Sequence, residues 1–319
     1  MGKKGRGRKK GEYNYLLMLA VVVTTWGVVP GFAKLSNLGG DITTFYVNWI
    51  AVVAVATIIT AIKGWQQLKE YSYRDYATMA LLGIAWPLVY SVAYFGAVQV
   101  GGPALTTILN YTWPVFALIF AYVLNRAQAT WVSMVSVIFA ATAVGVTCFF
   151  ESRVGVGLSL MALSLGTVAA VTQGFYSSAT DRWKYDPWTM TFVVELVTAV
   201  GVTLFVVARG SFIFPDLQSL AYLTVIGAIS NGIGFWAFLA GSQSSGNAGM
   251  NAKCTWLIGM CLVPFAQVIL LPILGVEQIS VWKWVGVALV ASSLAAHRIG
   301  SLLIKKKVEP PPSWMRHIT

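Results

Sequence analysis

The sequence predicts an all-α integral membrane protein with ten transmembrane helices, arranged as two inverted five-helix repeats with both termini in the cytoplasm. Three observations predict this fold class: an apolar composition, ten apolar segments of bilayer length, and a weak internal repeat. Hydrophobic residues make up 57% of the 319 residues and charged residues only 10%, whereas about 25% of a soluble globular chain is charged. The mean hydropathy of +0.71 agrees with a membrane protein.

Ten apolar segments follow one another along the chain, each near the 20-residue length that crosses a bilayer as a helix. They cover residues 14–35, 42–63, 75–99, 101–124, 128–150, 156–181, 187–209, 216–243, 247–274 and 279–303. Their residues do not alternate between polar and apolar in short blocks, so a transmembrane β-barrel is not expected. Connections such as "NRAQ" are short, so consecutive helices should run antiparallel.

The distribution of Lys and Arg orients these segments. Ten crossings put both termini on one side, and that side carries 17 of the 22 Lys and Arg, including six in the arm of residues 1–13. The other side carries three, and two lie within segments. Cytoplasmic loops are enriched in Lys and Arg, so the arm and the tail of residues 304–319 are expected in the cytoplasm. The same pattern explains the net charge of +11 without a nucleic-acid partner.

Short matches relate the two halves of the chain. "GIAWPLVYSVAYFGAVQ" from Gly83 aligns with "GAISNGIGFWAFLAGSQ" from Gly227, and "WPVFALIF" from Trp113 aligns with "VPFAQVIL" from Val263. With the further matches of Thr25 to Val168 and of Trp131 to Trp282, the offset drifts only from 143 to 151 residues. Because five helices is an odd number, the two repeats, residues 14–150 and 156–303, should have opposite orientations. Inverted repeats are typical of secondary transporters that bind substrate near the midplane between the halves.

Three motifs carry a family resemblance: "TTWG" in the first segment, "YTWPVFALIFAYVL" in the fourth and "VPFAQVILLPILGVEQI" in the ninth. With them, residues 14–303 resemble the EamA-type ten-helix carriers of the drug/metabolite transporter superfamily. The aromatic third and fourth segments look like the YddG-type aromatic amino-acid exporters. This resemblance implies a multi-pass exporter of aromatic and other neutral amino acids in the bacterial inner membrane. Asn48 stands where relatives often carry an Arg, so roles that rest on that Arg do not transfer.

An aromatic stripe marks the third segment. Trp86, Tyr90 and Tyr94 are spaced by four residues, so on a helix they point within an arc of about 80°. Lipid offers their polar atoms no partner, so the stripe should face either a cavity, which we favour, or a neighbouring helix. Pro87 favours the cavity because it removes a backbone donor and frees the carbonyl of Gly83.

Corresponding polar and aromatic groups recur in the second half, where Asn231 aligns with Pro87 and Trp236 lies near the position of Tyr94. In the sixth segment, Gln173 and Tyr176 are also candidates. A glutamine amide inside a membrane needs a partner, which is either a substrate or a freed backbone carbonyl.

The motif "ILNYTWP" in the fourth segment contains a proline that frees the carbonyl of Asn110, namely Pro114. Tyr111 and Trp113 are two residues apart and cannot share one face of a continuous helix. We therefore expect one of them to line a cavity and favour Tyr111, while a plain proline kink with a packed Trp is the alternative.

Two ionisable residues lie inside predicted segments and are functional candidates by default. Lys253 in the ninth segment either meets a substrate carboxylate or extends to the cytoplasmic surface. Glu195 is the only acidic residue well inside a segment. It either takes up a proton for coupling or pairs with a lysine or the backbone.

Together these residues predict a substrate site for a small neutral or aromatic amino acid. Because aromatic rings also attract cations, a multidrug or cationic-metabolite exporter is the alternative. An enzyme is not expected, since both histidines lie near the C-terminal end and no segment has a central Asp. The three cysteines form no pattern for a metal or a disulfide, and no cofactor is expected. The predicted site residues are Trp86, Tyr90, Tyr94, Asn110, Tyr111, Trp113, Gln173, Tyr176, Asn231, Trp236 and Lys253, with kinks at Pro87, Pro114 and Pro264.

Overall fold

The computed structural model describes residues 14–62, 64–125, 131–153, 159–179, 185–248 and 250–307, and all regular elements in these ranges are helical. The arm of residues 1–13 and most of the tail of residues 304–319 lie outside the described residues. Helices occupy all ten predicted segments. Among the described residues, six helices are long and apolar enough to cross a membrane, and four more apolar helices are shorter. The count of ten crossings and the cytoplasmic termini therefore stay predictions.

The first half of the chain forms helices that match the first five predicted segments, although α9 continues beyond residue 150. Their bounds are α1 (Tyr15–Gly27), α2 (Val29–Leu35), α3 (Gly40–Ala61), α4 (Trp65–Leu68), α5 (Tyr73–Gly83), the π-helical η1 (Ile84–Leu88), α6 (Val89–Gly101), α7 (Pro103–Asn110), α8 (Trp113–Asn125) and α9 (Trp131–Arg153).

The second half has a similar order of elements, except that α10 is continuous where α1 and α2 are separate and that no short helix among the described residues corresponds to α4. Their bounds are α10 (Leu160–Ala179), α11 (Pro187–Arg209), α12 (Leu217–Thr224), the π-helical η3 (Val225–Gly234), α13 (Phe235–Asn247), α14 (Met250–Gly259), α15 (Leu262–Ile273) and α16 (Val281–Lys307).

Polar side chains define where several helices begin. Ser72 forms a capping box with Asp75 at the start of α5. Asp186 accepts from the backbone N–H of Thr189 at 3.0 Å before α11, and Asp216 caps α12 in the same way. These caps satisfy backbone donors at the helix ends, so the chain can turn within a few residues between helices.

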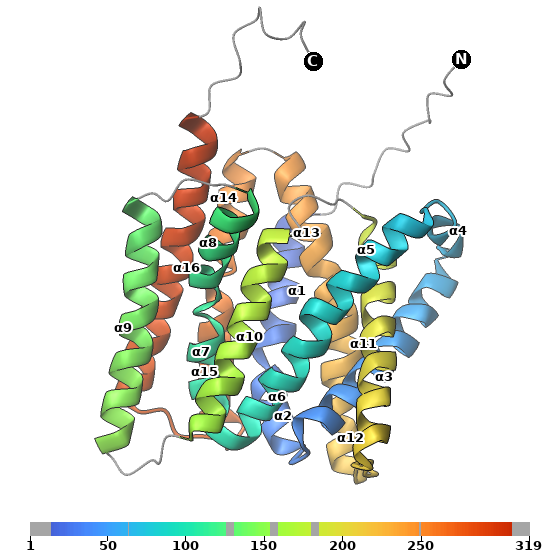
Figure 1. Ribbon diagram of the computed structural model, residues 1–319, viewed down its shortest axis with the longest axis horizontal. Coiled ribbons are helices and arrows are strands. Elements are labelled where there is room, and N and C mark those ends of the chain that lie inside the picture. Colours follow the sequence, from blue (N-terminus) through green and yellow to red (C-terminus); the bar gives the residue numbers. More distant parts are fainter. Residues whose placement is uncertain are drawn as a thin grey trace, which may run out of the picture.

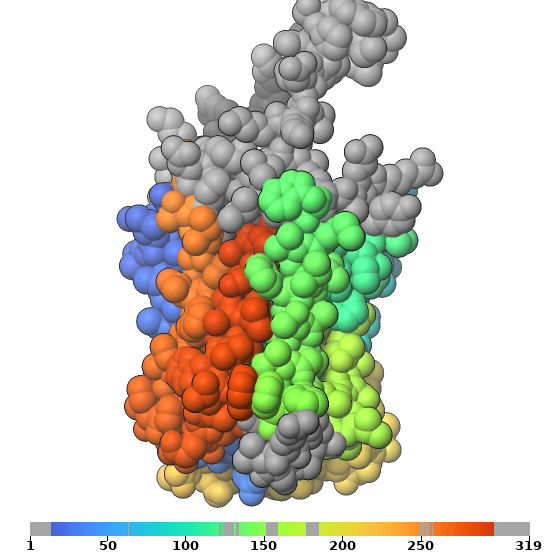
Figure 2. Space-filling model, turned by 90° about the vertical axis from the view of Figure 1, so that its left-hand side faces the viewer, coloured from blue at the N-terminus to red at the C-terminus, as the bar shows by residue number. Residues whose placement is uncertain are grey.

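Figure 1 shows the helices running side by side in one bundle, with α9 and α16 at one edge and α3 and α11 at the other. In Figure 2, α9 and α16 cover the middle of the face at the first edge. Serines join this pair, since the Ser136 hydroxyl donates to the Ser293 carbonyl at 2.8 Å and Ser293 donates back at 2.7 Å. The outer face of α9 exposes large apolar side chains such as Trp131 and Ile138, which suits contact with lipid.

Helices of the two halves interlock in the middle of the bundle. α10 packs against α6 and α8, and α1 packs against α13 and α15. Likewise α3 packs against η3, and α11 packs against η1. Under the predicted alignment, each of these contacts has its equivalent in the other half.

Interrupted helices surround this central region. Two of the long helices contain a π-helical segment, η1 with Pro87 and η3 with several glycines. Three others break into two helices, and each break lies close before a proline: Pro30, Pro114 or Pro264. Proline lacks the backbone donor that a continuous helix needs, and π-helical turns are often found at functional sites. The interruptions leave backbone groups near the centre of the bundle that require other partners.

Candidate functional site

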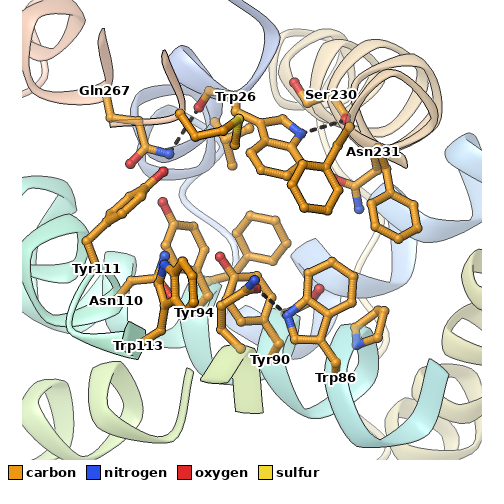
Figure 3. A pocket seen from close by; sticks show the side chains of 18 of the residues that line it. Trp26, Trp86, Tyr90, Tyr94, Asn110, Tyr111, Trp113, Ser230, Asn231 and Gln267 are labelled. Carbon is orange, nitrogen blue, oxygen red and sulfur yellow. Dashed lines mark hydrogen bonds between the residues drawn. The ribbon is translucent and has the colours of Figure 1, made fainter. Parts of the chain in front are cut away.

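A cavity of about 110 Å³ lies among the interrupted helices. Both halves of the chain form its wall, as Figure 3 shows for part of it. The wall is mostly aromatic and apolar, with a few amides and hydroxyls and one carboxylate. The lining residues are Trp26, Val29, Trp86, Pro87, Tyr90, Ser91, Tyr94, Phe95, Asn110, Tyr111, Trp113, Gln173, Glu195, Ser230, Asn231, Phe235, Phe238, Met260, Gln267 and Leu294.

The aromatic stripe of η1 and α6 forms one side of this cavity. The rings of Trp86 and Tyr90 lie 5.6 Å apart, and those of Tyr90 and Tyr94 are stacked at 5.4 Å with an angle of 13°. Tyr176 of α10 stacks on Trp86 at 4.1 Å. Cavity lining and helix packing, the two alternatives for this stripe, therefore occur together.

A hydrogen bond fixes the orientation of the Trp86 indole, whose N–H donates to Oε1 of Gln173 at 2.5 Å. This contact joins η1 to α10 at the cavity wall. Gln173 thus pairs with the Trp86 side chain and also lines the cavity. Neither of the two partners expected for it, a substrate or a freed backbone carbonyl, is the partner found here.

Side chains of the second half satisfy the backbone groups at the break between α1 and α2. The Ser230 hydroxyl donates to the carbonyl of Thr25 at 2.6 Å, and the Gln267 amide donates to the carbonyl of Trp26 at 3.1 Å. In return, the Trp26 indole N–H donates to the carbonyl of Ser230 at 3.2 Å (Figure 3). The break is therefore held by α15 and η3, and one face of Trp26 is presented to the cavity.

Glu195 carries the single carboxylate of the wall. It lies in the middle of α11 and is only 3% exposed. The side chain of Asn231 on η3 interacts with it, but its Oε2 has no hydrogen-bond partner among the described residues. Oδ1 of Asn110 is a second buried acceptor without a partner in the described part of the chain. The lining residues include no Lys, Arg or His.

Eight of the eleven predicted substrate residues line the cavity. Two do not: Tyr176 lies behind Trp86, and Trp236 stacks on Trp188 at 4.5 Å. Lys253 belongs to α14, but its side chain falls outside the described residues. The predicted coupling residue Glu195 shares the cavity with the aromatic stripe.

The expectation that only one of Tyr111 and Trp113 lines the cavity was wrong, because both do. The helix is interrupted between them, since α7 ends at Asn110 and α8 begins at Trp113. The spacing rule of a continuous helix therefore does not apply across this break.

The predicted kink residues lie at interruptions. Pro87 is inside η1, and the carbonyl of Gly83 accepts from the Thr198 hydroxyl at 3.4 Å. Pro114 is the second residue of α8 and Pro264 the third residue of α15. Prolines in a first turn remove donors that have no partner inside the helix.

Several wall residues were not predicted, among them Trp26, Ser230 and Gln267. Gln267 lies within an apolar segment, so the reasoning applied to Gln173 would have identified it. Trp26 belongs to the motif "TTWG", which carried only the family resemblance. Apolar wall residues such as Met260 and Leu294 give no sequence signal that separates them from ordinary packing.

Residues 14–149 match the model of the EamA-like transporter family. The first half of the chain is therefore similar to an EamA-like transporter domain. The chain has no match among curated proteins. It is similar to a solved structure described only as "Crystal structure of protein", with 18% identity, a TM-score of 0.62, and coverage of 92% of this chain and 99% of the other. At that identity the likeness shows a shared fold alone.

Proposed function

Because residues 14–149 match the EamA-like transporter family, we propose that the protein is a membrane carrier for small neutral amino acids, aromatic ones included. The observation that carries this proposal is the central cavity, which combines an aromatic stripe with amides and one carboxylate. Such a wall can bind an apolar side chain and a polar head group of the same solute.

Alternating access between two inverted five-helix repeats is the mechanism we propose. The equivalent contacts of the two halves support it, as do the π-helical segments η1 and η3, which lie at aligned positions. In inverted-repeat carriers, the substrate binds where interrupted helices of both halves meet. The cavity lies at such a place, and rocking one half against the other would open it to either side in turn.

The size of the cavity favours small solutes. Its volume of about 110 Å³ is below the range of about 300–1,000 Å³ of sites for drug-sized ligands. An apolar cavity of about 150 Å³ is known to hold benzene, so a benzyl side chain requires only a modest outward movement of the wall. This comparison disfavours a multidrug exporter.

The membrane setting follows from the same resemblance and from the positive charges. We propose that the carrier lies in a bacterial inner membrane with both termini in the cytoplasm, as 17 of its 22 Lys and Arg predict. Export is the direction implied by the resemblance to YddG-type carriers, and the cavity supports their substrate class through its stacked rings.

Uptake into proteoliposomes tests the proposal. Purified protein should carry labelled phenylalanine and smaller neutral amino acids into the vesicles, and excess unlabelled substrate should compete. Trp86→Ala should reduce the rate at least about tenfold, since stacked aromatic contacts and buried area are lost together. Tyr73→Phe is the control, because Tyr73 is 87% exposed and is not one of the wall residues. Equal rates in protein-containing and empty liposomes would refute transport of amino acids.

A second candidate is a carrier of small cationic metabolites, which Glu195 favours because no cationic side chain lines the described wall. A monovalent amine would neutralise the carboxylate and could lie over the rings. The same liposome assay with labelled amines compares the two classes.

A further inference from the structure

We propose that the carboxylate of Glu195, together with the amide of Asn231, binds the protonated primary amine of the transported solute, and that a proton replaces this ammonium group when the carrier is empty. This inference rests on the proposed transport function and assigns a role to one side of the cavity. The ligand class is a small solute with a primary ammonium group next to an apolar or aromatic body.

The first argument is the position of the carboxylate. Glu195 lies in the middle of α11, away from the donors of a helix N-terminus, and it lines the cavity while only 3% exposed. The Asn231 side chain lies close to the carboxylate and interacts with it. Oε2 lacks a hydrogen-bond partner among the described residues, so an acceptor remains for a ligand.

The second argument is charge. A buried carboxylate without a cation is costly, and both ion pairs of the described residues, Arg209 with Asp41 and Lys283 with Glu277, lie elsewhere. Tyr176 of α10 is the titratable side chain that faces Glu195. Four of the described elements pack against α11: η1, α13, α3 and α5. η1 and α13 contain no titratable residue. α3 and α5 contain titratable residues, but none of these lines the cavity: Asp41, Tyr46, Tyr73, Arg74, Asp75 and Tyr76. Charge neutrality therefore requires a cationic ligand or a proton at Glu195.

The third argument is the fit of an ammonium group. It has three donors and no acceptor, so it suits a wall with unpaired acceptors such as Oε2 of Glu195 and Oδ1 of Asn110. The rings of Trp86 and Tyr90 line the same cavity and attract a cation through their faces. A carboxylate head group alone would meet Glu195 with like charge.

The exchange of the two ligands is balanced in charge at the site. When the ammonium group leaves Oε2 on one side of the membrane, a proton from water binds to Oε2. The carrier then releases this proton to water on the other side. Exchange of a monovalent amine for a proton moves no net charge. Exchange of a zwitterionic amino acid for a proton moves one positive charge. The effect of a membrane potential on the transport rate therefore distinguishes amino acids from monovalent amines.

Three matched ligands test the site by quenching of tryptophan fluorescence in purified protein: phenylalanine, 2-phenylethylamine, which lacks the carboxylate, and 3-phenylpropionate, which lacks the amine. Wild-type protein should bind at least one of the two amines at least about tenfold more tightly than 3-phenylpropionate, a factor that corresponds to one charge-assisted contact. Glu195→Gln should remove this preference, and Glu195→Asp should restore part of it. Glu70→Gln, at an exposed turn, is the control. Equal binding of 3-phenylpropionate and the amines to wild type, or an unchanged preference in Glu195→Gln, would overturn the inference.

Proteoliposomes with a pH dye complete the test. Substrate efflux through wild-type protein should drive proton entry, and a potassium diffusion potential should alter the rate for phenylalanine but not for 2-phenylethylamine. Glu195→Gln should show no proton movement. If phenylalanine is transported with no proton movement by wild type, the exchange fails while the transport function stands. If no solute is bound or transported, the proposed function itself fails. Thermal unfolding shows whether each variant is folded, and Asn231→Leu provides a second substitution at the site should Glu195→Gln not fold.

Discussion

The side-chain amide of Gln267 donates to the carbonyl of Trp26 at 3.1 Å and thereby connects α15 to the last turn of α1. The carbonyl oxygen of the same amide accepts from the Thr107 hydroxyl of α7 at 3.2 Å. One glutamine, only 5% exposed, thus links the first, fourth and ninth of the predicted segments at the cavity wall.

Replacing Gln267 by Leu should destabilise the protein by about 1–3 kcal/mol, because it leaves the carbonyl of Trp26 and the hydroxyl of Thr107 without this buried partner. Thermal unfolding in detergent measures the change. Gln66→Leu, at an exposed position in α4, is the control and should leave the unfolding temperature nearly unchanged. A loss in Gln267→Leu no larger than in the control would show that the link does not contribute to stability.

Trp86 and Gln173 should be energetically coupled through their hydrogen bond of 2.5 Å. We expect Trp86→Phe and Gln173→Leu each to weaken substrate binding, with a coupling energy of about 0.5–2 kcal/mol in a double-mutant cycle. Trp86→Phe retains a ring against Tyr176 but removes the N–H donor. Additive effects of the two substitutions on the dissociation constant would contradict the coupling.

Gly174 permits α10 to approach α8 closely. A Cβ atom there would lie 2.7 Å from the backbone N of Ala117 and 2.9 Å from the carbonyl oxygen of Trp113. Gly174→Ala should therefore cost about 1–3 kcal/mol of stability through overpacking. Gly145 in α9 has open space around its Cβ position, so Gly145→Ala should be neutral or slightly stabilising. Equal unfolding temperatures for the two variants would refute the close approach.

Helix positions could be predicted from the sequence because apolar length and the cost of unpaired backbone in lipid leave few alternatives. The internal breaks were only partly predictable. Pro87, Pro114 and Pro264 mark three of them, but η3 contains no proline and gives no such signal.

The cavity wall was predictable where polar or aromatic side chains lie inside apolar segments. Trp86, Tyr90, Tyr94 and Asn110 are examples, since such groups need partners that lipid cannot supply. Trp236 has the same sequence signal but stacks on Trp188, because helix rotation is set by neighbours rather than by local sequence. The sequence pattern therefore identifies polar and aromatic side chains that need a partner, but it does not show whether the cavity or a neighbouring helix provides that partner.

Glu277, in the connection between α15 and α16, should stabilise the start of α7. One oxygen accepts from the backbone N–H of Ala104 at 3.1 Å, and the other pairs with Nζ of Lys283 at 2.9 Å. Ala104 lies in the first turn of α7, where a carboxylate also favours the helix dipole. Glu277→Ala should therefore destabilise the protein by about 1–2 kcal/mol, whereas Glu277→Gln keeps an acceptor for Ala104 and should lose less. Lys283→Met separates the two contributions, since it removes the ion pair and leaves the bond to Ala104. Unfolding temperatures that fall equally in Glu277→Gln and Glu277→Ala would assign the effect to the charge rather than to the cap.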